Sequence, residues 1–245
     1  MRWQDAQPGL WADAERKVRT ALQQQVVGGA LVGAQYLVVT AGGTQIELHV
    51  GGADAATGRP MERATSQMAY SITKAITAIA ALRLVDAGAL SLDRPLSDYF
   101  RAHPYGDAVL VRHLLAHTSG VPNPAPLSWF SVEGEPIDRS GRLRDVLRSH
   151  PRLVAAPGAT YRYSNLGYWL LEEVIQAASG MDYAEYVGRH IFGPLEGAAP
   201  IAFEPPDEAR MAVGHTARFH PMGVVLRALT PRRYWASSVG RWRRA

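Results

Sequence analysis

The stretch that most constrains the fold is residues 71–87, SITKAITAIAALRLVDA. Apolar residues cover most of its helical faces, and its charged residues are Lys74, Arg83 and Asp86. A helix that is apolar on most sides has to be surrounded by other elements of the fold. We therefore predict a buried helix that ends near Gly88, where a glycine can cap it. The other elements of the chain are expected to pack around this helix.

A helix and a hairpin are predicted before it. Apolar residues recur at helical spacing in residues 10–26, with charged residues between them, which predicts an amphipathic helix. Residues 31–39 form an apolar run, and residues 45–50 alternate apolar and polar side chains, as strands do. Gly42 and Gly43 lie between the two runs and favour a turn. The two strands are therefore expected to pair as an antiparallel hairpin.

Helices dominate the rest of the chain. The patterns predict further helices at residues 141–149, 165–179 and 182–192, and a long proline-rich loop at 122–136. A hairpin followed by a mostly helical region is typical of an α+β fold. The 245 residues are enough for such a unit with a core of useful size.

The positive charge of the chain is concentrated at one end. Six of the 26 basic residues and none of the 22 acidic ones lie in residues 227–245. That leaves 20 basic residues against 22 acidic ones in residues 1–226. A nucleic-acid-binding domain is expected to carry its basic residues on a face or stripe of the fold. We therefore predict one domain over residues 1–226, an arginine-rich tail over 227–245, and no nucleic-acid partner.

Two absences narrow the function further. The chain has no cysteine, which excludes disulfides, thiolate metal sites and a cysteine nucleophile. The first nine residues, MRWQDAQPG, lack the apolar run of a signal peptide, and no run of about 18 apolar residues could span a membrane. On this basis a cytoplasmic location is expected.

Ser71 and Lys74 are the first candidates for chemistry. Positions i and i+3 share a face of a helix, so the Lys74 ammonium can reach the Ser71 hydroxyl. A serine becomes a nucleophile when a neighbouring base takes its proton, and burial favours the neutral form of a lysine. The alternative is a serine that caps the helix and a lysine that reaches the surface. The sequence Ser71-Ile72-Thr73-Lys74 alone leaves both interpretations open.

Tyr163 and Asn165 are the second pair. Two residues apart in an extended segment, their side chains point the same way. A tyrosine can relay a proton, and an asparagine can bind a carbonyl or hold Lys74. Alternatively, Asn165 caps the following helix and Tyr163 only packs.

His113 and His117 have the i, i+4 spacing of a zinc site, but a helix end is favoured because the other ligands of a zinc protease are absent.

Five blocks of the sequence together resemble the serine β-lactamase and penicillin-binding-protein superfamily. Within it, the resemblance is to the class C-like branch, which includes carboxylesterases and D-stereospecific peptidases. It covers about residues 10–215 and implies a β-lactamase-like serine hydrolase fold, with the hairpin as part of its sheet. The blocks are residues 71–100, 111–123, 157–180 and 183–195 and, more weakly, the hairpin at 31–50.

The resemblance also implies a role for each candidate residue. Ser71 is the nucleophile that becomes acylated, with its backbone N–H as half of the oxyanion hole, and Lys74 is its general base. Tyr163 shares the proton transfers, while Asn165 orients substrate and Lys74. The substrate implied is a small ester or amide, and neither a cofactor nor a metal is expected.

One departure from the family concerns its third motif, Lys/His-Thr/Ser-Gly, which lies on a strand of the sheet near the C-terminus. His117-Thr118-Ser119-Gly120 lies between the first two motifs, and His215-Thr216-Ala217 lacks the glycine. We therefore expect the C-terminal sheet strands to be missing from these residues. Removing one oxyanion donor costs about a hundredfold to a thousandfold in turnover. Weak or no turnover is expected from this chain alone.

Two other functions stay open at this point. One is a catalytically impaired, truncated member of the family that acts as a binding scaffold or fragment. The other is a contact of residues 227–245, which carry Trp235 and Trp242, with an anionic membrane surface or a nucleic acid. A solvated end is favoured over such a contact.

Overall fold

A computed structural model of the chain describes residues 8–124, 138–195, 201–203, 207–216 and 243–244. These residues form two compact units. The hairpin unit consists of residues 8–67, 207–216 and 243–244, and the helical unit of residues 68–124, 138–195 and 201–203. Most of the predicted loop at 122–136 lies outside the described residues, as does the proposed boundary at 226, so both stay predictions.

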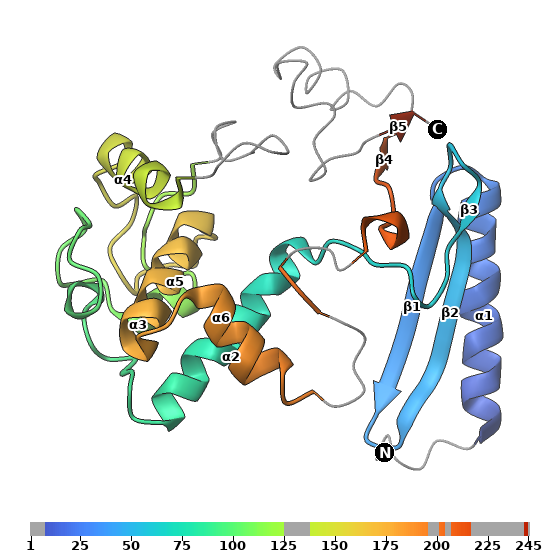
Figure 1. The fold of residues 1–245 in the computed structure, drawn as a ribbon, viewed down its shortest axis with the longest axis horizontal. Helices are drawn as coiled ribbons and strands as arrows, with labels where there is room; N and C mark the ends of the chain where they lie inside the picture. The colour runs from blue at the N-terminus through green and yellow to red at the C-terminus, as the bar shows by residue number, and fades with distance from the viewer. Residues whose placement is uncertain (1–7, 125–137, 196–200, 204–206, 217–242, 245) are drawn as a thin grey trace. The chain divides into compact units, whose positions relative to one another are not determined.

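The hairpin unit contains the predicted helix and hairpin (Figure 1). Helix α1 (Pro8–Val27) runs along the hairpin and packs against strand β2 (Gly43–Asp54). Strand β1 (Gly33–Thr40) pairs antiparallel with β2 and is the edge of the sheet. On the other side of β2 lies β3 (Arg59–Pro60), which is too short for its sequence to predict.

The alternation of side chains along β2 explains its position. Ile46, Leu48 and Val50 are buried, and the residues between them are not fully buried. Every second residue of a strand faces the same side, so these three form one apolar face. On the edge strand β1, in contrast, Leu37 and Val39 are 60% and 61% exposed.

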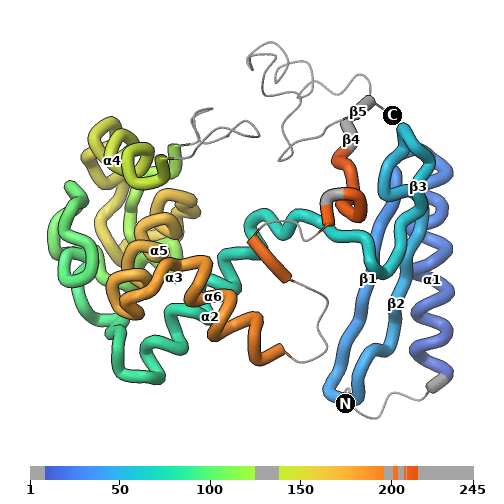
Figure 2. The backbone as a smooth tube through the Cα atoms, in the orientation of Figure 1, coloured from blue at the N-terminus to red at the C-terminus, as the bar shows by residue number. Residues whose placement is uncertain are grey.

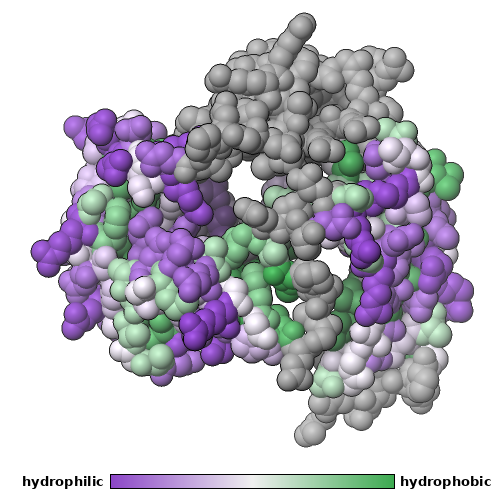
Figure 3. Space-filling model, in the orientation of Figure 1, coloured by the Kyte–Doolittle hydropathy of each residue, from purple (hydrophilic) through white to green (hydrophobic). Residues whose placement is uncertain are grey.

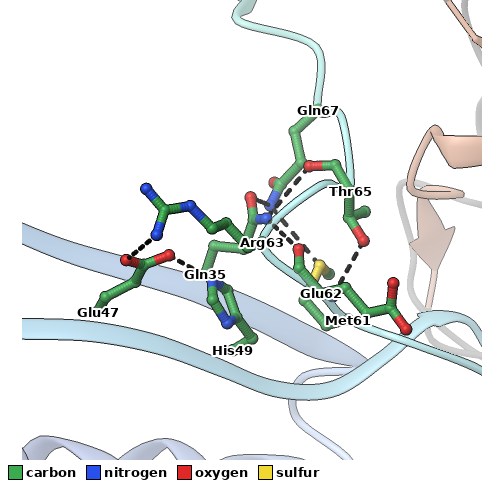
Figure 4. Close-up of polar contacts among 8 residues, drawn as sticks. All are labelled: Gln35, Glu47, His49, Met61, Glu62, Arg63, Thr65 and Gln67. Carbon is green, nitrogen blue, oxygen red and sulfur yellow. Dashed lines mark hydrogen bonds and ion pairs between the residues drawn. The ribbon is translucent and has the colours of Figure 1, made fainter. Parts of the chain in front are cut away.

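A network of polar side chains fastens the segment after β3 to the hairpin (Figure 4). Gln35 on β1 donates from its Nε2 to the carbonyl oxygens of Glu62 and Thr65, at 2.7 and 3.1 Å. Its Oε1 accepts from Gln67 at 2.8 Å. Arg63 forms an ion pair with Glu47 on β2. The segment that leads toward Ser71 is therefore held on both strands of the hairpin.

Residues distant in sequence complete the hairpin unit. Ser66 forms an isolated parallel bridge with Met211, beside the turn η6 (Glu208–Arg210). Strand β4 (His215–Thr216) pairs in parallel with β5 (Arg243–Arg244). The rest of the predicted arginine-rich tail lies outside the described residues, so its contact with a membrane surface is untested.

The helical unit is built around one helix, α5 (Asn165–Ser179), which confirms the helix predicted there. Helix α5 contacts α2, α3 and α6, and Figures 1 and 2 show these helices side by side. Its inward side chains are buried: Leu166, Leu170, Leu171, Val174 and Ile175. The other elements are η2 (Tyr70–Ile72), α2 (Thr73–Asp86), η3 (Leu96–Asp98), α3 (Val111–Leu115), α4 (Arg139–Ser149), α6 (Tyr183–Val187) and η5 (Gly188–Phe192).

Two helix predictions are corrected in this unit. Helix α2 is not buried on most sides, because Ile79 and Leu82 are 50% and 45% exposed; Figure 3 shows hydrophobic side chains gathered over this helix. Its other face, with Ala80 and Ala81, does enter the core. The helix predicted at 182–192 is interrupted, since α6 gives way at Gly188 to one turn of π-helix.

Within the described part of the chain, no helix combines the length and the apolar character that crossing a membrane requires.

Candidate active site

Ser71 lies on a short 3-10 turn, η2, that leads directly into α2. Its side chain is exposed, and its Oγ lies 2.9 Å from the phenol oxygen of Tyr163. The residue before it, Tyr70, has a φ of 43°, in the left-handed region that costs a residue with a side chain about 1–2 kcal/mol. Strained backbone of this kind clusters at functional sites, which supports Ser71 as a candidate.

Lys74 is half-buried one helical turn after Ser71, as the spacing predicted. Its Nζ donates to Asn165 Oδ1 at 2.8 Å and to Ser71 Oγ at 3.4 Å. The ammonium also lies over two aromatic rings, 4.9 Å from the ring centre of Tyr163 and 5.7 Å from that of Tyr168. It therefore points into the site, which excludes the alternative of a lysine that reaches the surface.

Tyr163 has a pKa below the ordinary value for tyrosine. Burial raises this pKa, but hydrogen bonds from Lys74 and Ser71 and the charge of Lys74 together lower it further than burial raises it. These contacts stabilise the phenolate relative to that of an ordinary tyrosine. A phenolate oxygen at hydrogen-bond distance from a serine hydroxyl can take its proton.

Asn165 is the first residue of α5, and its side chain reaches Lys74. The alternative interpretation of Asn165 as the helix cap is wrong, because the cap is Ser164. The Ser164 hydroxyl accepts from the Gly167 N–H at 2.9 Å and donates to the Pro122 carbonyl at 2.7 Å. Because Ser164 caps the helix, the Asn165 side chain is left for the site.

Residues 117–123, which we call the bracing segment, hold the chain that carries Tyr163 and Asn165. The Arg162 N–H donates to the His117 carbonyl at 2.7 Å. The Asn165 N–H donates to Asn123 Oδ1 at 2.9 Å. These bonds lie on either side of Tyr163 and fix its position.

Gly120 makes the close approach of the bracing segment possible. Its φ is 70°, and a Cβ at this position would lie 2.0 Å from the carbonyl oxygen of Ala155. Across this contact the Val154 N–H donates to the Gly120 carbonyl at 2.8 Å. Only glycine combines this conformation with this space.

His117 has the most contacts in the bracing segment. Its Nδ1 accepts from the Ser164 N–H at 3.2 Å. Its ring lies 4.6 Å from the ring of Tyr163 and 4.8 Å from that of Tyr168. Burial, and then the charge of Lys74, lower the pKa of His117, which keeps its ring neutral and Nδ1 free to accept.

The zinc alternative for His113 and His117 rests on a shared helix face, which the structure does not provide. Helix α3 ends at Leu115, and His117 has a left-handed backbone beyond it. His113 uses its Nδ1 to accept from the Leu110 N–H at the start of α3. Across the described ranges, no three His, Asp or Glu side chains are grouped in a way that could hold a metal ion.

A shallow hollow of about 510 Å³ opens beside Tyr163. Its walls are largely aromatic and aliphatic, with one amide and one guanidinium group. Val154 and Tyr161 are 52% and 65% exposed in it. The residues that line it are Val121, Asn123, Val154, Tyr161, Arg162 and Tyr163. The volume of this hollow is that of a site for a small organic group, and of the four candidate residues it is lined by Tyr163 and not by Ser71, Lys74 or Asn165.

All four candidate residues predicted from the sequence meet in the helical unit. The sequence analysis missed two neighbours: Asn123, which it placed only in a loop, and His117, which it assigned to a helix end. Asn123 lies 42 positions before its partner Asn165, and nothing in the local pattern pairs them. His117 lies more than 40 positions before Tyr161, Tyr163 and Tyr168, whose rings it contacts, so the local pattern does not pair these residues either.

Comparison with known proteins decides the family. The sequence model of the family described as Beta-lactamase matches residues 15–242. The chain belongs to the β-lactamase family. This result confirms the resemblance and the β-lactamase-like α+β fold expected from the sequence.

Individual relatives support the same assignment. Protein flp of Staphylococcus aureus (strain MW2) is 29% identical over 194 residues, which are 76% of this chain and 38% of the relative. Penicillin-binding protein 4* of Bacillus subtilis (strain 168) is 32% identical over 139 residues, 56% of this chain and 30% of the relative. The solved structure of EstCE1, a hydrolase with promiscuous acyltransferase activity, has a TM-score of 0.72 and 25% identity. The match covers 83% of this chain and 57% of EstCE1.

The chain thus spans about two fifths or less of the length of these two curated relatives. The hits support serine hydrolase-type acyl transfer as the general chemistry of the family.

Proposed function

We propose that this chain is a serine hydrolase that acts on a small ester or amide by acyl transfer through Ser71. The observation that carries the proposal is the 2.9 Å contact between Ser71 Oγ and Tyr163 Oη, with Lys74 against both residues. A nucleophile, its base and a cation beside that base are the groups that acyl transfer needs.

In the proposed acylation step, Tyr163 takes the proton of Ser71, and Ser71 Oγ attacks the carbonyl carbon of the substrate. The positive charge of Lys74 stabilises the phenolate before the transfer. A protonated lysine cannot accept a proton, so in this step Tyr163 takes the role of base that the resemblance implies for Lys74. The backbone N–H of Ser71 donates to the oxyanion. Collapse of the tetrahedral intermediate breaks the ester or amide bond, and the proton passes to the leaving group.

The acyl-enzyme is then hydrolysed by water. In this step Tyr163 takes a proton from a water molecule, and the water oxygen attacks the acyl carbonyl carbon. The bond from that carbon to Ser71 Oγ then breaks, and the proton passes from Tyr163 to Ser71 Oγ as the acid product leaves. The Asn165 amide uses its Oδ1 on Lys74 and one Nδ2 proton on Asn123, so its second Nδ2 proton is free to bind the carbonyl of a substrate. The hollow beside Tyr163 offers room for the rest of a small substrate.

Covalent labelling tests this proposal. The purified chain is incubated with a fluorophosphonate and, separately, with a penicillin, and the intact mass and the modified peptide are read by mass spectrometry. We expect an adduct on Ser71 that Ser71→Ala abolishes. Ser149→Ala, which removes an exposed hydroxyl at the end of α4, serves as the matched control and retains the adduct.

The alternative, a binding scaffold without catalysis, predicts a different result. A chain that is folded by circular dichroism but forms no adduct with either reagent overturns the proposed acyl transfer. An adduct without turnover keeps the nucleophile and supports the catalytically impaired member of the family. The labelling experiment does not test the predicted cytoplasmic location.

A further inference from the structure

Asn123 forms two hydrogen bonds with a single residue of the proposed site. Its Oδ1 accepts from the Asn165 backbone N–H at 2.9 Å and from Asn165 Nδ2 at 3.1 Å. The first bond satisfies one of the free N–H groups at the start of α5. The second is made to the side chain that touches Lys74, so Asn123 has a connection to the chemistry that a helix cap does not need.

The second bond determines which way the Asn165 amide points. An amide has a donor end and an acceptor end. With Nδ2 held by Asn123, the Oδ1 end faces Lys74 Nζ at 2.8 Å. The opposite orientation would place Nδ2 against the ammonium and the Asn165 oxygen against Asn123 Oδ1. Both of those contacts are repulsive.

Among the described residues, Lys74 has no carboxylate partner and relies on this carbonyl. In the parts of the chain that are described, Lys74 takes part in no ion pair, and its oxygen partners are Asn165 Oδ1 and Ser71 Oγ. A neutral acceptor orients an amine without the strong stabilisation of its charged form that a carboxylate provides. The direction of one amide therefore controls where Lys74 Nζ is held relative to Ser71.

We propose that Asn123 is a positioning residue for the acylation of Ser71, which fixes the Asn165 amide with its carbonyl toward Lys74. This inference rests on the proposed function. It assigns to the bracing segment a part in the reaction, through hydrogen bonds to Asn165 alone.

Labelling rates of four variants test the proposal. Asn123→Asp keeps an acceptor oxygen in the same place, whereas Asn123→Leu has a similar shape and no acceptor. We expect Asn123→Leu to lower the second-order rate constant of fluorophosphonate labelling about tenfold, as the loss of one hydrogen bond of about 1.4 kcal/mol does. Asn123→Asp keeps the acceptor but also adds a negative charge near Lys74, so its rate constant should recover most of the roughly tenfold loss rather than equal that of the parent chain.

Asn123→Leu is also introduced into the Asn165→Ala chain, which separates a positioning role of Asn123 from a purely structural one. Without the amide of Asn165, Asn123 has nothing to orient, so the additional loss caused by Asn123→Leu should be less than about twofold. An equal loss in both backgrounds overturns the proposal and leaves Asn123 as a helix cap. Labelling of Asn123→Asp that is as slow as that of Asn123→Leu overturns it too.

A second measurement needs no acylation. The Nδ2 protons of Asn165 are observed by nuclear magnetic resonance in the ¹⁵N-labelled chain and are assigned by their loss in Asn165→Ala. We expect their exchange with water to be slow in the parent chain and in Asn123→Asp, and at least about tenfold faster in Asn123→Leu. Unchanged exchange in Asn123→Leu refutes the orientation of the amide. A parent chain that is not labelled refutes the proposed function instead, and the exchange rates still decide the role of Asn123.

Discussion

The phenol oxygen of Tyr163 lies 2.9 Å from the hydroxyl oxygen of Ser71, although 92 positions separate the two residues in the sequence. Lys74 lies against both side chains, and Asn165 holds Lys74. Four polar groups from two segments of the chain, residues 71–74 and 163–165, thus share one small volume, and each can be removed separately to test its role.

Substitution of Tyr163 by Phe removes the proposed proton acceptor and keeps the ring that packs on His117. We expect the rate of Ser71 labelling to fall about 10²–10⁴-fold, as general-base catalysis contributes that much. Because the pKa of Tyr163 is lowered, labelling of the parent chain should rise with pH and level off below the ordinary tyrosine pKa of 10.0. Labelling rates measured from pH 6 to 10 check this, and a rise that persists in Tyr163→Phe contradicts the role of the phenol.

His117 makes the stability of the helical unit sensitive to acid. Its Nδ1 accepts from the Ser164 N–H, and its pKa is below the ordinary 6.5. Between this lowered pKa and 6.5 the unfolded chain binds more protons than the folded chain. The contribution of His117 to the free energy of unfolding should therefore fall as the pH falls through this window and be complete above pH 6.5, and it is read as the difference between the parent chain and a variant without the imidazole. Urea unfolding between pH 5 and 8 measures the effect.

A matched variant at the same position isolates the imidazole. Asparagine tolerates the left-handed backbone of His117, whose φ is 54°, and its Oδ1 can accept the Ser164 N–H without titrating in this range. We expect His117→Asn to lose part of the acid sensitivity. If the variant and the parent chain show the same pH dependence of unfolding, another group is responsible.

Glu172 should make the chain less stable as the pH rises. Burial raises the pKa of Glu172 to about 7, although Arg139 beside it acts in the opposite direction. Between its ordinary pKa of 4.5 and about 7 the Glu172 carboxyl binds more protons in the folded chain than in the unfolded chain, so its contribution to the free energy of unfolding falls across this range, opposite in sign to that of His117. Glu172→Gln should remove up to about 3 kcal/mol of this loss at pH 8. Glu185→Gln, on the exposed side of α6, is the control that should leave the pH dependence unchanged.

Gly120 and Gly180 allow backbone strain to be separated from steric collision. Their φ angles are 70° and 69°, but only at Gly120 would a Cβ collide, with the carbonyl of Ala155. We expect Gly180→Ala to cost about 1–2 kcal/mol from the left-handed backbone alone. Gly120→Ala should cost clearly more and should also slow Ser71 labelling, because the bracing segment moves. Equal losses of unfolding free energy in the two variants would show that the bracing segment can move away from Ala155 at no cost in stability.

The sequence predicted those parts of the site that depend on local spacing. Ser71 and Lys74 are three residues apart, Tyr163 and Asn165 are two apart, and helical and extended geometry fixed the relation within each pair. The meeting of the two pairs came from the family resemblance, since no local rule connects segments that far apart. The helix and the hairpin of the hairpin unit followed from periodicity alone.

What the sequence did not predict depends on contacts between distant segments. Asn123 was predicted only as part of a loop. Its contact with Asn165, 42 positions away, depends on how two distant segments pack, which the local sequence does not show. The alternative interpretation placed the cap of α5 at Asn165 rather than at Ser164, because both residue types cap helices well and the bond from Ser164 to the distant Pro122 carbonyl leaves no local signal. Helix α2 was expected to be buried on most sides because its composition does not show how many neighbours surround it.

The long separation of Ser71 and Tyr163 has a consequence for how the site comes into being. Each segment can adopt its local structure early, but the two oxygens meet only after a loop of 92 residues has closed, at a large cost in chain entropy. Contacts of this range form late compared with those inside a helix. A reagent that reacts with Ser71 therefore counts the molecules that have completed folding, whereas helix content measured by circular dichroism also counts those that have not.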